Sequence, residues 1–169
     1  MSEESERKVN EIFYAIERAG FPSYPLRLAA RPHISLALYS DYDLDALEKK
    51  VKEFTASHSS VKLKLSGIGT FPGDSAVVFL IPTVSEKLVD LHSEFHTEFD
   101  REGGHYSNHY QPEYWVPHCT VAFDVDRDEV FKIMDICRKF KFPIDITLDQ
   151  IGVACFKPSE NLFCYKFKD

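Results

Sequence analysis

The chain has 169 residues, of which 44% are hydrophobic, and a formal net charge of −7 at pH 7. The charge argues against extended tracking along nucleic acid, because such binding needs many Lys and Arg contacts to phosphate, but a small anionic ligand in a local pocket is compatible with it. No apolar run approaches the roughly 18 residues that a membrane helix needs, and residues 1–6 are acidic, unlike a signal peptide. We therefore expect a soluble, cytoplasmic protein that acts as a monomer and has no membrane partner.

The four cysteines show no Cys-x-x-Cys spacing and lie in apolar stretches of sequence. They are Cys119, Cys137, Cys155 and Cys164. This pattern predicts reduced, buried thiols in preference to disulfides or a zinc knuckle.

The first half of the chain predicts two helices and a strand between them. Residues 6–20 carry apolar side chains at helical spacing up to Gly20. An irregular stretch then leads to a strand over residues 34–40, which begins just after His33. Asp43 can cap the next helix, whose apolar positions recur at the helical period up to about Ser57.

A hairpin is predicted next. Alternating apolar residues mark a strand over residues 61–71, in which Gly67 and Gly69 suggest a bulge or a close backbone approach. Residues 72–74 have turn chemistry, and a second strand follows over residues 76–81.

The second half repeats this order. A helix is predicted over residues 84–99 and another over residues 126–139, separated by a polar, Tyr-rich loop and the strand that follows His118. Residues 144–156 and 162–167 predict a closing pair of strands, joined by residues 157–161.

Both halves therefore follow the order helix, strand, helix, strand, strand, which suggests an internal duplication. We expect one domain over residues 1–169, with pseudo-symmetric lobes built from repeats 3–83 and 84–168. The predicted class is α+β: a bilobal fold of duplicated αβαββ units, with two antiparallel sheets around a central cleft and helices on the outer faces.

Two similar motifs stand at corresponding positions of these halves. The first reads Arg31-Pro32-His33-Ile34-Ser35 and the second Val116-Pro117-His118-Cys119-Thr120. Their histidines are 85 positions apart. Because side chains alternate along a strand, each histidine and the hydroxyl residue two positions later share one face. One such histidine alone is most often structural, but the symmetric repetition points to catalysis.

Two imidazoles that face one cleft can divide the proton transfers of a displacement reaction. One takes a proton from the attacking group while the other gives a proton to the leaving oxygen. The hydroxyls of Ser35 and Thr120 can hydrogen-bond the non-bridging oxygens of a phosphoryl group. Thr120 is equally explained as a good strand residue.

With these paired motifs in a duplicated α+β chain, the sequence resembles the two-histidine (2H) phosphoesterase superfamily, which includes proteins named 2′-5′ RNA ligase and RNA 2′,3′-cyclic phosphodiesterase. The resemblance implies a metal-independent phosphodiesterase without cofactors, acting on 2′,3′-cyclic phosphate or 2′,5′-linkages of RNA ends or small nucleotides, and capable of the reverse ligation. It assigns His33 and His118 as catalytic residues, and Ser35 and Thr120 as phosphate-binding residues.

The sequence departs from the family pattern after the second motif. Some members carry a basic residue there, whereas this chain has the apolar run Val121-Ala122-Phe123. Loop placement suggests further substrate-binding candidates, although solvent exposure or core packing explains them as well: the basic residues Arg31 and Lys157 and the aromatic residues Tyr114, Trp115, Phe71 and Phe156.

Two alternatives remain at this point. The same cleft could bind a nucleotide or an RNA end without catalysis. The other histidines could instead hold zinc, since His92 and His96 are four positions apart and His105 and His109 follow. The glutamate of a His-Glu-x-x-His motif is absent, and histidines are common on polar helix faces.

Overall fold

The computed structural model describes residues 1–169 except 22, 24–29, 72, 74, 101–103, 106, 157–158 and 169. It forms two compact units. Unit 1 contains Met1–Ile34, Lys62–Thr83 and His118–Thr147, and unit 2 contains Ser35–Val61, Val84–Pro117 and Leu148–Asp169. Both units combine helices with antiparallel strand pairs, which confirms the predicted α+β class. None of the helices in the described ranges has the length and apolarity that crossing a membrane requires.

The units are interleaved along the chain. Each of the predicted repeats, 3–83 and 84–168, supplies segments to both units, so the units do not coincide with the repeats. The chain passes between units at Ile34 to Ser35, inside the first motif, and at Pro117 to His118, at the second. The duplication itself stays a prediction.

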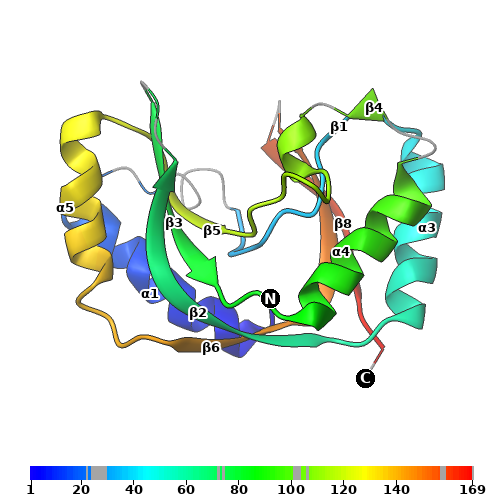
Figure 1. Ribbon diagram of the computed structural model, residues 1–169, viewed down its shortest axis with the longest axis horizontal. Coiled ribbons are helices and arrows are strands. Elements are labelled where there is room, and N and C mark those ends of the chain that lie inside the picture. Colours follow the sequence, from blue (N-terminus) through cyan, green and yellow to red (C-terminus); the bar gives the residue numbers. More distant parts are fainter. Residues whose placement is uncertain are drawn as a thin grey trace. The chain divides into compact units, whose positions relative to one another are not determined.

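Unit 1 is built on a four-stranded sheet with the order β5-β3-β2-β6 (Figure 1). The strands are β2 (Val61–Phe71), β3 (Ala76–Pro82), β5 (Cys119–Val125) and β6 (Ile144–Leu148). Strand β3 is central and antiparallel to both β2 and β5. The register of β2 against β3 shifts between Leu65 and Gly67, where the sequence predicted a bulge.

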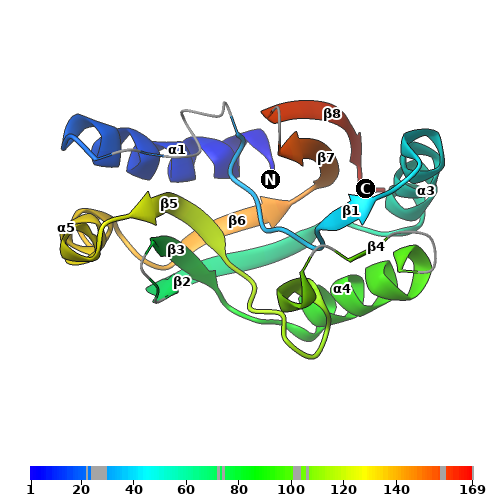
Figure 2. The same cartoon turned by 90° about the horizontal axis from the view of Figure 1, so that it is seen from above.

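Two helices accompany this sheet in the part of unit 1 that the structure describes. Helix α1 (Glu3–Arg18) is capped by Ser2, whose hydroxyl accepts from the Ser5 N–H, and it buries an apolar stripe of Val9, Ile12, Phe13 and Ile16. Helix α5 (Arg127–Cys137) contacts β3, β5 and α1 (Figure 2). The core of this unit therefore lies between the sheet and its helices.

Two helices in the described part of unit 2 are joined by edge-to-face aromatic contacts. Helix α3 (Leu44–Ser57) begins at the predicted cap, where the Asp43 carboxylate accepts from the Ala46 N–H at 2.8 Å. The Phe54 ring lies 5.7 Å, centroid to centroid, from both Phe95 and Phe99 of α4 (Glu86–Phe99). These buried rings hold the two helices side by side (Figure 1).

Short strand pairs make up the rest of unit 2. Strand β1 (Tyr39–Asp41) pairs antiparallel with β4 (Gly104–His105), and β7 (Gln150–Phe156) pairs antiparallel with β8 (Ser159–Lys166). Helix α3 contacts β7 and β8. One turn of 3-10 helix, η1 (Asn108–Tyr110), lies within the predicted loop.

Three predicted strands were wrong in extent. The last one, expected over residues 162–167, spans Ser159–Lys166 and so includes part of the predicted connection. The strand expected over residues 34–40 is confined to β1, because the carbonyls of Ser35 and Leu36 accept hydrogen bonds from side chains of unit 2. The strand expected over residues 144–156 is broken at Asp149. Its first part, β6, joins the four-stranded sheet, whereas its second part, β7, pairs with β8.

The prediction of buried cysteines holds for half of them. Cys119 and Cys137 are buried, but Cys155 and Cys164 are exposed on β7 and β8. All four are free thiols. The apolar context misled the prediction for Cys155 and Cys164 because both faces of a two-stranded ribbon can remain open to solvent.

Candidate active site

Strand β5 presents the second motif. Cys119 and Val121 are fully buried, whereas Thr120 and His118 are partly exposed, as strand alternation requires. Thr120 lies opposite Phe79 of the neighbouring strand β3. The histidine and the hydroxyl of this motif are therefore held at the accessible side of β5, and Cys119 between them belongs to the core.

Two phenyl rings support the His118 imidazole. Phe71 meets it edge to face at 4.9 Å between ring centroids, and Phe79 lies 5.3 Å away. The two phenyl rings pack on each other at 4.4 Å. Such contacts restrict the orientation of the imidazole.

Gly69 of β2 leaves room for this aromatic cluster. It lies opposite Phe79 in the register, and a Cβ atom at Gly69 would come within 2.7 Å of Phe79 Cε2. No real Cβ tolerates that approach, so any other residue would displace the ring. The sequence suggested a bulge or a close backbone approach here, and the group that comes close to Gly69 is the Phe79 side chain.

His33, the histidine of the first motif, is exposed and has a fixed ring orientation. Its Nδ1 lies 2.7 Å from the carbonyl oxygen of Arg31. Because a carbonyl can only accept, Nδ1 is the protonated nitrogen and donates this bond. Nε2 is then the nitrogen that remains for acid or base chemistry.

The backbone of the first motif contacts the second motif. Burial raises the pKa of the Cys119 thiol to about 12, and a hydrogen bond from the His33 backbone acts in the opposite direction. His33 therefore lies beside the residue that immediately follows His118. Both histidines belong to unit 1, so one compact body carries them.

Arg31 is engaged by a carboxylate of helix α1. Its Nε and Nη2 both lie 2.8 Å from Glu6 Oε1. The Arg31 side chain is about half exposed, whereas that of Glu6 is largely covered. This pair ties the residue two positions before His33 to α1, a structural role that the sequence did not suggest.

Ser35 lies in unit 2, where it contacts Tyr110 and Trp115. Its hydroxyl hydrogen-bonds the phenol of Tyr110, an interaction that lowers the pKa of Tyr110 against the larger raising effect of burial. Its carbonyl oxygen accepts from Trp115 Nε1 at 3.0 Å. Trp115 also stacks on His92 at 3.7 Å between ring centroids, so its indole is used for packing in unit 2.

The histidines proposed as zinc ligands have other contacts. His92 Nε2 and His96 Nε2 each lie 3.1 Å from the carbonyl oxygen of Leu36. His96 Nδ1 also contacts the Asp100 carboxylate at 2.9 Å. His109 lies in η1 and is exposed.

The remaining candidates lie elsewhere in unit 2 or outside the described residues. Tyr114 is 62% exposed and Phe156, at the end of β7, is 61% exposed. Lys157 lies outside the described residues. Phe71, by contrast, lies in unit 1 against His118, so of the aromatic candidates it is the one placed at a catalytic candidate.

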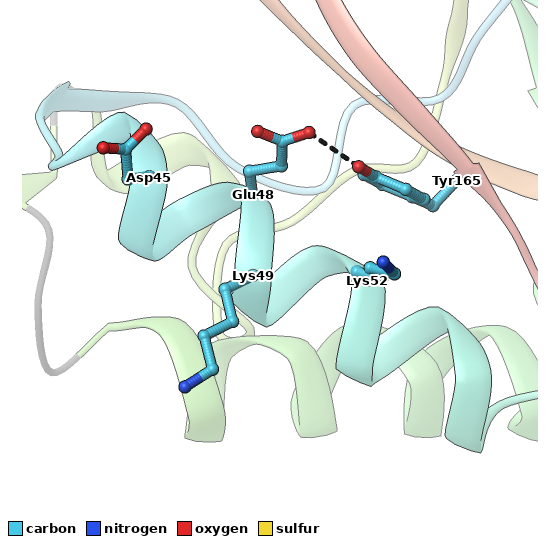
Figure 3. Close-up of a pocket in the computed structure, with 5 residues that line it drawn as sticks. All are labelled: Asp45, Glu48, Lys49, Lys52 and Tyr165. Carbon is cyan, nitrogen blue, oxygen red and sulfur yellow. Dashed lines mark hydrogen bonds between the residues drawn. The ribbon is translucent and has the colours of Figure 1, made fainter.

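A surface pocket of about 360 Å³ lies between α3 and β8 (Figure 3). It is lined by Asp45, Glu48, Lys49, Lys52 and Tyr165. The Tyr165 hydroxyl donates to Glu48 at 2.6 Å, and both residues line the pocket. No residue of either histidine motif lines it, so we do not assign the chemistry to this pocket.

A family model described as the 2′-5′ RNA ligase superfamily matches residues 5–155. The match covers most of the chain and includes both motifs. The chain belongs to the 2′-5′ RNA ligase superfamily. The predicted relationship to 2H phosphoesterases is thereby confirmed. No curated protein matches the sequence significantly.

In this member of the superfamily, sequence reasoning missed the residues that support the motifs. Phe79 looks like an ordinary strand residue, although its position across the hairpin from Gly69 was a signal for a close contact. Glu6 gave no signal, because its partner Arg31 is 25 positions away. Tyr110 stands out in the sequence only as part of a Tyr-rich loop.

Proposed function

We propose that this chain is a metal-independent phosphodiesterase that opens 2′,3′-cyclic phosphates or hydrolyses 2′,5′-phosphodiester linkages in RNA ends or small nucleotides. Membership of the superfamily supports the reaction class. The observation that carries the proposal is the contact of the His33 backbone with Cys119, the neighbour of His118, within one compact unit. An exposed and a partly exposed imidazole on one body suit paired acid and base catalysis.

In cyclic phosphate opening, water attacks the phosphorus atom as the bond to one ribose oxygen breaks. One neutral imidazole takes a proton from the water, and the other, as imidazolium, gives a proton to the departing oxygen. The product is a phosphomonoester beside a free ribose hydroxyl. His33 can serve in either role through Nε2, because its Nδ1–H is committed to the Arg31 carbonyl.

The hydroxyls of Thr120 and Ser35 have a proposed role in binding phosphate. Each is an O–H donor that can bond a non-bridging phosphate oxygen, on which charge builds up in the transition state. Thr120 is supported by its place on β5, two residues after His118. For Ser35 the support is its place in the first motif.

The test is hydrolysis of a 2′,3′-cyclic mononucleotide and of a 2′,5′-linked dinucleotide by the wild type and by His33→Ala and His118→Ala. Each variant should lose on the order of 100-fold or more in kcat, because general acid or base catalysis contributes about 10² to 10⁴. Activity in EDTA should persist. The pH profile of kcat/KM should be bell-shaped.

His109→Ala is the matched control, since it removes an exposed histidine outside both motifs. It should keep wild-type kcat. Full activity of His33→Ala would contradict the mechanism. Tight nucleotide binding without turnover by the wild type would identify a binding module instead.

A further inference from the structure

Two buried histidines of α4 are directed at one backbone carbonyl. His92 and His96 are 1% and 3% exposed, and each donates from Nε2 to the Leu36 oxygen at 3.1 Å. A carbonyl oxygen has two lone pairs, so both bonds can form together. Leu36 directly follows Ser35, the hydroxyl residue of the first motif.

The preceding carbonyl is held in the same way. Trp115 Nε1 donates to the Ser35 oxygen at 3.0 Å, and the indole lies nearly parallel to His92, at 3.7 Å and 4°. Two successive peptide groups are thus fixed by side chains. A strand ladder would fix such groups through backbone partners, but among the described residues this segment is assigned to no strand before β1.

Packing alone does not require these polar groups. Buried imidazoles lose hydration, and apolar residues could fill the same space at lower cost. The pair is instead part of a wider network, because the Asp100 carboxylate accepts from His96 Nδ1 and from the Tyr39 hydroxyl, at 2.9 Å in each case. Satisfied polar networks of this kind fix one backbone arrangement.

We propose that His92, His96 and Trp115 are positioning residues that hold the Ser35–Leu36 backbone so that the Ser35 hydroxyl is correctly directed toward phosphate. This role rests on the proposed function. Fixing both carbonyls restricts the rotation of the peptide planes on either side of Leu36. The orientation of the Ser35 side chain follows, and Tyr110 contacts its hydroxyl.

The test compares His92→Leu, His92→Gln and Trp115→Phe in turnover of a 2′,3′-cyclic mononucleotide. His92→Leu and Trp115→Phe each remove one donor and should lower kcat at least about tenfold, because misplacement by about 1 Å can cost 10²-fold. His92→Gln keeps an N–H at a similar reach and should recover most of kcat. KM should change less than kcat.

A double-mutant cycle with Ser35→Ala separates positioning from general destabilisation. If His92 acts through Ser35, then His92→Leu should cause little further loss of kcat in the Ser35→Ala protein. His58→Leu is the matched control, because His58 also bonds a backbone carbonyl in unit 2, that of Phe54 at 2.7 Å, away from the motif. It should keep wild-type kcat.

The outcomes separate this inference from the proposed function. An active wild type with unchanged kcat in His92→Leu, or with additive losses in the cycle, would overturn the positioning role alone. An unaffected Ser35→Ala protein would overturn it as well. A wild type that turns over no cyclic or 2′,5′-linked substrate would overturn both.

Discussion

At the scale of single residues, the candidate site depends on the steric fit of neighbouring side chains as well as on their functional groups. The Phe79 ring lies across Gly69, and this arrangement places the ring against the His118 imidazole. Gly67, two residues earlier in β2, has more room, because a Cβ there would lie 3.4 Å from Ile81 Cδ1. Of these two glycines, Gly69 is therefore the one at which an added Cβ would displace a ring that contacts His118.

We expect Gly69→Ala to displace the Phe79 ring and disturb His118. Overpacking of this kind costs about 1 to 3 kcal/mol of unfolding free energy, and kcat should fall about tenfold through the misplaced imidazole. Gly67→Ala should leave kcat unchanged. Urea denaturation and nucleotide turnover measure the two effects, and equal activity of both variants would contradict this account.

At the scale of elements, helix α4 carries a titratable group in a buried position. Burial and the neighbouring His96 charge lower the pKa of His92 from 6.5 to about 4, against smaller raising effects from the Leu36 and Tyr110 carbonyls and Asp100. The folded protein therefore keeps His92 neutral at pH values where the unfolded chain has protonated it.

Unfolding free energy should consequently fall as pH is lowered from about 6.5 to about 4. In that window the unfolded state binds the proton and the folded state does not, which costs about 3 kcal/mol by the lower end of the window. Above about pH 6.5, His92 is neutral in both the folded and the unfolded state, so its protonation no longer lowers the unfolding free energy. Fluorescence of the single tryptophan, Trp115, reports the transition, since its ring stacks on His92.

His92→Leu is the comparison for this prediction. Carboxylates elsewhere also lose stability in acid, so the informative quantity is the difference between variant and wild type. That difference should shift in favour of the variant as pH falls from 6.5 to 4. A constant difference across the window would refute the assignment.

The helices were predictable from sequence because their signals are local. Apolar residues at helical spacing marked α1 and α4, and Asp43 marked the start of α3. The bulge and close approach near Gly67 and Gly69 were also visible, since glycine inside a strand often marks one or the other. The pairing of histidine and hydroxyl was readable from strand alternation.

The remaining features depend on partners far along the chain. Residues 34–38 have strand-forming composition, but His92 and His96, 56 and 60 positions away from Leu36, take its carbonyl. Residues 144–156 read as one strand because local preference does not reveal that Asp149 separates two sheets. Periodicity cannot show such contacts between distant segments.

At the scale of the whole molecule, each unit needs three separate segments of the chain. The sheet of unit 1 takes β2 and β3 from residues 61–82 but β5 and β6 from residues 119–148. A fragment that stops after the first predicted repeat therefore leaves β3 without its partner β5.

We expect a fragment of residues 1–83 to remain unfolded, because it lacks both outer strands of the sheet and helix α5. Circular dichroism and amide proton dispersion measure this outcome against the full chain. A cooperatively folded fragment would show instead that the first repeat is a self-sufficient lobe.

The interleaving also sets an order of events during synthesis on the ribosome. The first unit is complete only when Thr147 has emerged from the exit tunnel, although its opening helix is made at the start. Until then, part of the apolar surface of α1 and of the β2–β3 hairpin remains exposed to solvent. Core residues that are translated early are therefore buried only after the later segments that cover them have been translated.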